Sequence, residues 1–319
     1  MSYASVEQRR FGLKKEGTRG TAESAPSAWW PIDKDTKFNY DLNHLKDDAL
    51  RGIPDMYPSV AGPLNGTGKL KLPLDAQACG ELFYSLLGDV SSAQQGGSAA
   101  YKHTFTRDLD SIERTAYTFF MDYGTSIVKK YNLGVVKAIT LTGPVDQLVT
   151  MDADILFKSE ADGSIGSPSF PTQRYMAFPH TTIKLGGVAN TDIRSWQLKI
   201  DGGSQPLRTL SQSQDIANIL VKAPLNITGN FVIYFQTDAI RDAFLANTTT
   251  TFQALIEHDI IASTYKYTVD INLYKIQYKA VPFGEQEGLL AANVDFDAVY
   301  STSDSKTIQV DVTNAATAY

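Results

Sequence analysis

Hydrophobic and polar residues alternate along most of this chain, and that pattern predicts β-strands. Residues 69–74 read Lys-Leu-Lys-Leu-Pro-Leu, so the leucines share one side of an extended chain. Segments that alternate in this way, or that are rich in β-branched and aromatic residues, predict further strands. These strands are expected at 101–107, 116–122, 127–131, 135–141, 148–158, 193–200, 229–236, 251–257, 265–279, 289–300 and 306–312.

Helical spacing occurs in two short segments. In residues 75–87, Asp75 is a suitable N-cap, apolar residues recur at helical intervals, and Gly88 is placed to end the helix. A second short helix is expected at 238–246. The sequence therefore predicts a mainly β protein.

Three segments interrupt the strands. Residues 1–32 are small, polar and charged, and they are expected to form an N-terminal arm that ends at Trp29 and Trp30. Residues 41–63 are expected to form a long loop, and loops of such length usually have a function. Gly and Pro are frequent in residues 161–180, which predicts a linker. The expected division is the arm, a first β domain at 33–160, the linker, and a second β domain at 181–319.

An internal repeat supports two similar domains. Residues 64–68 (Leu-Asn-Gly-Thr-Gly) match 225–229 (Leu-Asn-Ile-Thr-Gly), and the same offset aligns the alternation that follows and the helical Phe83 with Phe244. Later, residues 151–157 resemble 294–300, although the offset has drifted. A match that continues from a glycine through a strand to a helix indicates a duplicated unit.

Composition and charge exclude several classes of function. Hydrophobic residues make up 43% of the chain and charged residues 20%, which is typical of a globular protein. The net charge of −6 disfavours tight binding to nucleic-acid phosphates. A single cysteine, Cys79, excludes an intrachain disulfide. The start of the chain has no apolar signal segment and no stretch is long enough to span a membrane, so synthesis in a cytosol is expected.

No group of residues has the spacing of an active site or a metal site. The four histidines are dispersed, and no nucleophile motif or phosphate loop is present. The pairs Asp152/Asp154 and Asp295/Asp297 could in principle ligate a metal, but residues two apart on a strand share a face, so a solvated acidic face is the simpler interpretation. Neither an enzyme nor a cofactor is expected.

The whole pattern resembles the tail tube proteins of long-tailed, siphovirus-type bacteriophages, in their two-domain form. Two strand–helix–strand units with long late hairpins are typical of that fold. The residues that carry the resemblance are 16–22 (Glu-Gly-Thr-Arg-Gly-Thr-Ala), 66–88, 195–200 (Ser-Trp-Gln-Leu-Lys-Ile), 227–229 and 294–300.

This resemblance implies two tandem β-barrel or sandwich domains, each with one short helix, whose inner sheets join between subunits into a ring. Rings would stack into a tube through which double-stranded DNA passes during genome ejection. Open sheet edges suit such assembly, because closing a ring removes them. The implied location is the virion tail, after assembly in the host bacterial cytoplasm, and the implied partners are other copies, a tape measure protein, and tail terminator and tip proteins.

Two sets of residues are candidates for function in such a tube. A conduit for DNA should repel it, so an acidic channel wall is expected, with Asp152, Asp154, Asp295 and Asp297 as candidates. Contacts between rings are expected from the arm and the long loop, at Trp29, Trp30, Arg51 and Tyr57.

Two similar domains per chain also predict a ring of three chains with pseudo-sixfold symmetry. The arm is expected to become ordered only on a neighbouring copy. Other interpretations remain open at this point. The chain could be the inner tube of a contractile injection system, which would share the fold. It could instead be a two-domain β-sandwich binding protein or adhesin, although the missing export signal disfavours this.

Overall fold

Strands dominate the fold, which confirms the mainly β prediction. The structure is a computed structural model that describes residues 5–47, 49, 55, 57–124 and 127–319. Within these residues, 19 strands belong to one hydrogen-bonded sheet system, while β14 and β15 pair separately. We call residues 10–162 the first half and residues 181–314 the second half.

The first half contains ten strands and one α-helix, preceded by a short 3-10 helix, η1. Their bounds are η1 Val6–Gln8, β1 Arg10–Lys15, β2 Ala28–Trp30, β3 Lys37–Leu45, β4 Val60–Pro73, α1 Gly80–Leu87, β5 Gly88–Gln94, β6 Tyr101–Arg107, β7 Tyr117–Asp122, β8 Val128–Pro144, β9 Thr150–Phe157 and β10 Ser159–Asp162.

The second half follows a second 3-10 helix, η2 Phe178–His180. Its elements are β11 Thr181–Leu185, β12 Val188–Asn190, β13 Ile193–Asp201, β14 Ser204–Leu207, β15 Asn218–Val221, β16 Asn226–Tyr234, α2 Ala239–Leu245, β17 Thr249–Ala262, β18 Tyr265–Ala280, β19 Phe283–Gln286, β20 Leu289–Ala298 and β21 Ile308–Asn314.

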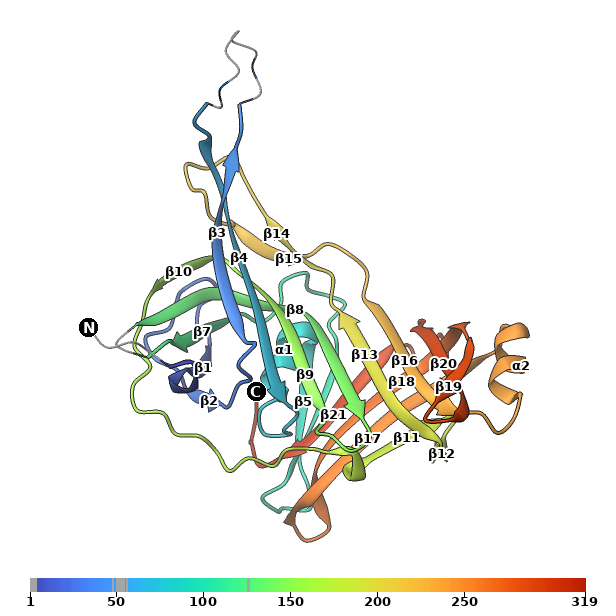
Figure 1. Cartoon of the computed structure of the whole chain (residues 1–319). Coiled ribbons are helices and arrows are strands. Elements are labelled where there is room, and N and C mark those ends of the chain that lie inside the picture. The colour runs from blue at the N-terminus through green and yellow to red at the C-terminus, as the bar shows by residue number, and fades with distance from the viewer. Residues whose placement is uncertain (1–4, 48, 50–54, 56, 125–126) are drawn as a thin grey trace.

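One continuous antiparallel sheet, which we call the inner sheet, runs through both halves. Its strand order is β3-β4-β9-β8-β13-β16-β20, ending on β18 and β19. The pairing of β8 with β13 joins the two halves, and Figure 1 shows these strands crossing the centre of the molecule.

A second layer packs on one face of the inner sheet. In the first half it consists of β2, β1 and β7, and in the second half of β12, β11 and β17. The hairpin of β5 and β6 pairs with β21 and so links the layers of the two halves. A single apolar core fills the space between the layers and extends through both halves; Phe11, Phe83, Phe231 and Phe252 are among its buried side chains.

The two halves repeat the same order of elements. In the first half the order is β1-β2-β3-β4-α1-β7-β8-β9-β10, and in the second half it is β11-β12-β13-β16-α2-β17-β18-β20-β21. The repeat is more extensive than the sequence indicated, since it includes the first two strands. The hairpins β5–β6 and β14–β15 and the short β19 interrupt it.

Strand pairing corrects the late part of the sequence repeat. Gly68 pairs with Ile155, and its counterpart Gly229 pairs with Phe296. Asp154, one residue before Ile155, is therefore the counterpart of Asp295. The sequence comparison had matched Asp154 with Asp297, so it was shifted by two residues.

The prediction of an extended N-terminal arm is wrong over β1 and β2. β1 pairs with both β2 and β7, and Phe11, Leu13 and Trp30 are at most 2% exposed. The sequence was misread because β1 is short and has charged residues on both sides. These strands belong to the outer layer of the first half.

The expected loop at 41–63 is largely a hairpin. β3 and β4 stay paired from Lys37↔Lys69 to Leu45↔Val60, so only residues 46–59 connect them. Figure 1 shows this hairpin projecting from the body beside β14 and β15. Gly and Pro in the sequence suggested a loop, but Gly62 and Pro63 lie within β4.

Of the linker expected at 161–180, residues 163–176 contain neither helix nor strand, whereas β10 extends to Asp162 and η2 occupies Phe178–His180. This segment still packs closely, because Met176 is fully buried and its backbone N–H donates to the carbonyl of Leu74 at 2.9 Å. Both helices lie within the predicted segments. α1 ends at Gly88 with φ 99°, as expected for a left-handed C-cap.

Two glycines of the sequence repeat have a packing role. A Cβ at Gly229 would lie 2.3 Å from Cζ of Phe296, and one at Gly68 would lie 2.6 Å from Cδ1 of Phe38. Each repeat glycine therefore makes room for an aromatic ring of the core. This explains why the repeat motif keeps a glycine within a strand.

We expect Gly229→Ala to lower the free energy of unfolding by about 1–3 kcal/mol, because the Phe296 ring must shift. Gly284→Ala is the matched control, since a Cβ there would meet nothing within 4 Å. Urea unfolding of the unassembled chain would measure both. Equal stability of the two variants would contradict this explanation of the repeat.

Candidate functional site

The joint between β8 and β13 is an ordinary antiparallel ladder between two otherwise similar halves. It runs from Ser195↔Pro144 to Asp201↔Ala138. Beside the ladder, Nε2 of Gln197 donates to Oγ1 of Thr142 at 3.2 Å. We call this pairing the internal joint.

Apolar packing reinforces the internal joint. The β14–β15 hairpin of the second half extends over the first half, and Ile216 and Ile219 pack there in a small separate core with Ala116, Leu133 and Val135. The internal joint therefore combines backbone pairing with side-chain burial.

Two strands at the ends of the inner sheet have the same positions in the repeat as the joined strands. β3 is the counterpart of β13, because Phe38 pairs with Gly68 as Leu198 pairs with Gly229. In the described part of the chain, β3 pairs only with β4. The outer edge of β3 is therefore unpaired, whereas the corresponding edge of β13 pairs with β8.

β19 has the position that the end of β8 has in the first half. Phe283 pairs with Ala292 as Leu141 pairs with Met151, and the repeat makes Ala292 the counterpart of Met151. Among the described residues, β19 pairs only with β20. Leu141 is buried, whereas Phe283 is 44% exposed. The open edges of β3 and β19 thus correspond to the two strand edges that pair in the internal joint, those of β13 and β8.

The face of the inner sheet that points away from the core is polar. Cross-strand pairs form continuous rows on it, because directly paired residues share a face. One row contains Lys71, Asp152, Thr140, Lys199, Thr228, Asp297 and Gln277. We call this surface the polar face.

All four predicted aspartates lie on the polar face. Asp152 and Asp297 belong to the row above, Asp295 pairs with Asn230, and Asp154 pairs with Lys69. A hollow of about 420 Å³ opens on this face beside Asp295 and Asp297.

Lysines lie among these aspartates, so the polar face carries both signs of charge. Nζ of Lys69 is 3.3 Å from a carboxylate oxygen of Asp152, and Nζ of Lys279 is 2.5 Å from one of Asp297. Lys199 lies in the middle of the row. The sequence missed this pairing because each lysine is on a different strand from its aspartate.

The predicted inter-ring residues have different environments. Trp30 is 2% exposed and its ring lies 6.1 Å from that of Phe11, so the prediction that it docks on a neighbouring copy is wrong. Trp29 is partly exposed, and Tyr57, which is 39% exposed, lies on the connection between β3 and β4. Arg51 lies outside the described residues.

The motif at 16–22 has a structural role that the sequence did not indicate. The Glu16 carboxylate is buried and accepts the backbone N–H of Leu133 at 2.7 Å and that of Gly20 at 2.6 Å. Arg19 in turn donates to the carbonyl of Ile219 in the β14–β15 hairpin. This loop therefore ties the outer layer to β8 and to the second half.

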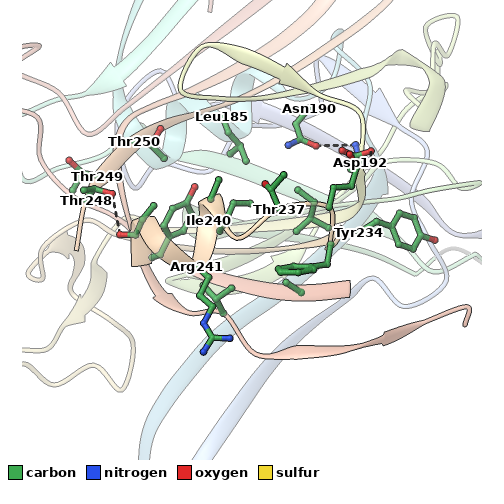
Figure 2. Close-up of a pocket in the computed structure, with 18 residues that line it drawn as sticks. Leu185, Asn190, Asp192, Tyr234, Thr237, Ile240, Arg241, Thr248, Thr249 and Thr250 are labelled. Carbon is green, nitrogen blue, oxygen red and sulfur yellow. Dashed lines mark hydrogen bonds between the residues drawn. The ribbon is translucent and has the colours of Figure 1, made fainter. Parts of the chain in front are cut away.

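The helix α2 packs more loosely than its counterpart α1. No residue of α2 is buried, whereas most of α1 is. A cavity of about 470 Å³ lies beside α2, and Figure 2 shows Leu185, Ile240 and Thr250 around it. The cavity has no cluster of titratable side chains suited to catalysis.

The described residues contain no group of three or more His, Cys, Asp and Glu side chains that could hold a metal ion. His103 is buried, with ring nitrogens bonded to Ser92 and Asn314, which gives it a structural role. No helix among the described residues is both long and apolar enough to cross a membrane.

The described residues thus form a layered, mainly β protein that has an internal joint between β8 and β13 and matching open edges at β3 and β19. The sequence matches the family model for phage tail tube proteins over residues 7–298. The match covers most of the chain, so this chain belongs to the phage tail tube protein family. The family indicates a tube-forming component of the virion tail. No curated protein matches the sequence.

We expect Glu16→Ala to lower the free energy of unfolding by about 2–4 kcal/mol, because the buried N–H groups of Leu133 and Gly20 lose their acceptor. Glu16→Gln should lower the free energy of unfolding by less, since the amide oxygen of Gln can still accept one of these hydrogen bonds. Glu7→Ala, at an exposed position, is the control. Thermal and urea unfolding would measure the differences. An unchanged free energy of unfolding in Glu16→Ala would refute the structural role of this carboxylate.

Proposed function

We propose that three copies of this chain close a ring, and that rings stack into the tail tube of a long-tailed phage. Two tandem domains, of which the first also includes β1 and β2, would fill two positions of a pseudo-sixfold ring. Heterologous contacts that close give rings, and ring faces then permit stacking.

The single observation that carries this proposal is the internal joint. Within one chain, it shows how a strand of the first half, β8, pairs with a strand of the second half, β13. Copying its register onto the open edges gives the joint between chains. Gln197 and Thr142 pair at the internal joint, and their counterparts are Lys37 on β3 and Gly284 on β19. Pairing these edges would satisfy the backbone groups that the free chain leaves open.

The polar face is then the candidate wall of the channel. It is opposite the apolar core, and it belongs to the inner sheet, which continues through both halves. Aspartates beside lysines would keep the wall from binding DNA phosphates, because an unpaired lysine adds a salt-dependent contact. Genome passage would then need no specific recognition of DNA.

Stacking between rings is assigned to the projecting end of the β3–β4 hairpin, near Tyr57. Trp29 remains a second candidate. A tape measure protein inside the tube, and terminator and tip proteins at its ends, are the further partners proposed. All of these contacts would form in the virion after assembly in the host cytoplasm.

The register of the chain–chain joint can be tested by cross-linking. Lys37→Cys and Gly284→Cys chains, purified separately and mixed, should form a disulfide-linked dimer, because the proposed register makes the two residues direct cross-strand neighbours. Non-reducing electrophoresis would measure it. The only native cysteine, Cys79, is buried and should not compete.

A matched control comes from the internal joint itself. One chain carrying both Thr142→Cys and Gln197→Cys should close the equivalent disulfide within the chain and give no dimer. If this control closes while the mixed chains never cross-link, the proposed joint is wrong. Six chains around the axis in a cryo-EM cross-section would overturn the ring of three.

The charge pairing predicts how the channel treats DNA. Asp152→Asn with Asp297→Asn leaves Lys69 and Lys279 without their partners, so assembled tubes should retain double-stranded DNA at low salt and release it at high salt. Co-sedimentation of DNA with tubes would measure this.

Asp238→Asn with Asp242→Asn, at exposed positions on or beside α2, changes the net charge equally and is the control. Equal DNA retention by the two double variants would argue against the polar face as the channel wall.

A further inference from the structure

The start of the β3 edge is covered by an arginine of the same chain. Arg9, just before β1, donates from Nη1 to the backbone carbonyl of Thr36 at 2.9 Å, and from Nη2 to the carbonyl of Lys34. The guanidinium therefore occupies the carbonyl immediately before β3 and a second carbonyl in the Asp33–Thr36 turn that leads into this strand. Charge-assisted bonds of this kind are among the stronger ones in proteins.

The internal joint reveals what these carbonyls would otherwise do. Thr36 is the counterpart of Trp196, which pairs with Gly143 of β8. Lys34 lies two residues earlier, as Arg194 does, and the Arg194 carbonyl accepts the backbone N–H of Val145 at 3.0 Å.

In the internal joint, these two positions accept hydrogen bonds from the neighbouring strand, because bonded pairs recur every second residue in an antiparallel ladder. Just before β3, Arg9 donates to both of the corresponding carbonyls, that of Thr36 next to the strand and that of Lys34 in the preceding turn.

We propose that Arg9 guards the β3 edge in the free chain and must leave it before a second copy can pair there. This inference rests on the proposed chain–chain joint. The incoming strand would be β19 of the second copy, and Glu285, the counterpart of Gly143, would bring its N–H to the carbonyl of Thr36.

The same incoming residue offers the displaced guanidinium a new partner. Glu285 is exposed, and no ion pair to it is found within the described chain. Its carboxylate would enter next to Arg9 as the backbone bonds exchange. The two edges are therefore complementary in charge as well as in backbone groups, and the exchange favours this pairing over association of two like edges.

Such a guard has a physical purpose. An exposed strand edge pairs readily with any other edge, and proteins block edges with charged residues to prevent this. A protein that must pair its edges needs a block that can be removed. A side chain held by two hydrogen bonds meets that requirement, whereas a proline or a bulge within the edge would block pairing permanently.

The test measures how fast the cross-link between Lys37→Cys and Gly284→Cys chains forms, with and without Arg9→Ala in the Lys37→Cys chain. Removing the guard should raise the initial rate about tenfold, which corresponds to about 1.4 kcal/mol. Arg9→Gln, which can still donate to one carbonyl, should give an intermediate rate.

Arg10→Ala is the control, because it removes the same charge from the neighbouring residue, whose side chain faces Asp122 instead of the β3 edge. Thermal unfolding of each variant would exclude a general loss of structure. An Arg9→Ala rate equal to that of Arg10→Ala, with the cross-link still forming, would overturn the guard and leave the ring intact. Absence of the cross-link in every variant would instead count against the chain–chain joint.

Discussion

The need of every strand edge for a hydrogen-bonding partner governs this protein. Backbone N–H and C=O groups at an edge must be paired or solvated, and an open edge invites association. Within the chain, β8 and β13 satisfy each other's edges by pairing. Among the described residues, β3 and β19 each have one unpaired edge, and because they repeat the strands of the internal joint, we propose that they pair with each other between two copies.

The two halves share their order of elements but differ in how closely the elements around their helices pack. The first half inserts the β5–β6 hairpin after α1, and this hairpin pairs with β21. The second half passes from α2 to β17 with only three intervening residues, 246–248, and leaves a cavity beside α2. The internal joint is consequently supported by the outer layer as well, and a joint formed only by β3 and β19 would lack that support.

Alternation along the strands divides the inner sheet into two chemically different surfaces. One side carries the aromatic core, and repeat glycines such as Gly68 and Gly229 make room for its rings. The other side carries rows of threonine, lysine and aspartate that continue across the internal joint. Each half contributes its own part of these rows, and the pairing of β8 with β13 makes them one continuous polar face.

The sequence determined the mainly β class and both helices, since these depend on neighbours within a few residues, and its internal similarity indicated the duplication. It also placed Asp152, Asp154, Asp295 and Asp297 on one kind of surface, because residues two apart on a strand share a face.

Only the tertiary structure decided that Trp30 is buried, that lysines form ion pairs with Asp152 and Asp297, and that β8 pairs with β13. Each of these depends on contacts between residues far apart in the chain, and the same local pattern is compatible with several strand partners. β1 and β3 were the hardest strands to predict, because charged and polar residues interrupt their apolar ones and make both segments resemble loops until a neighbouring strand pairs with them.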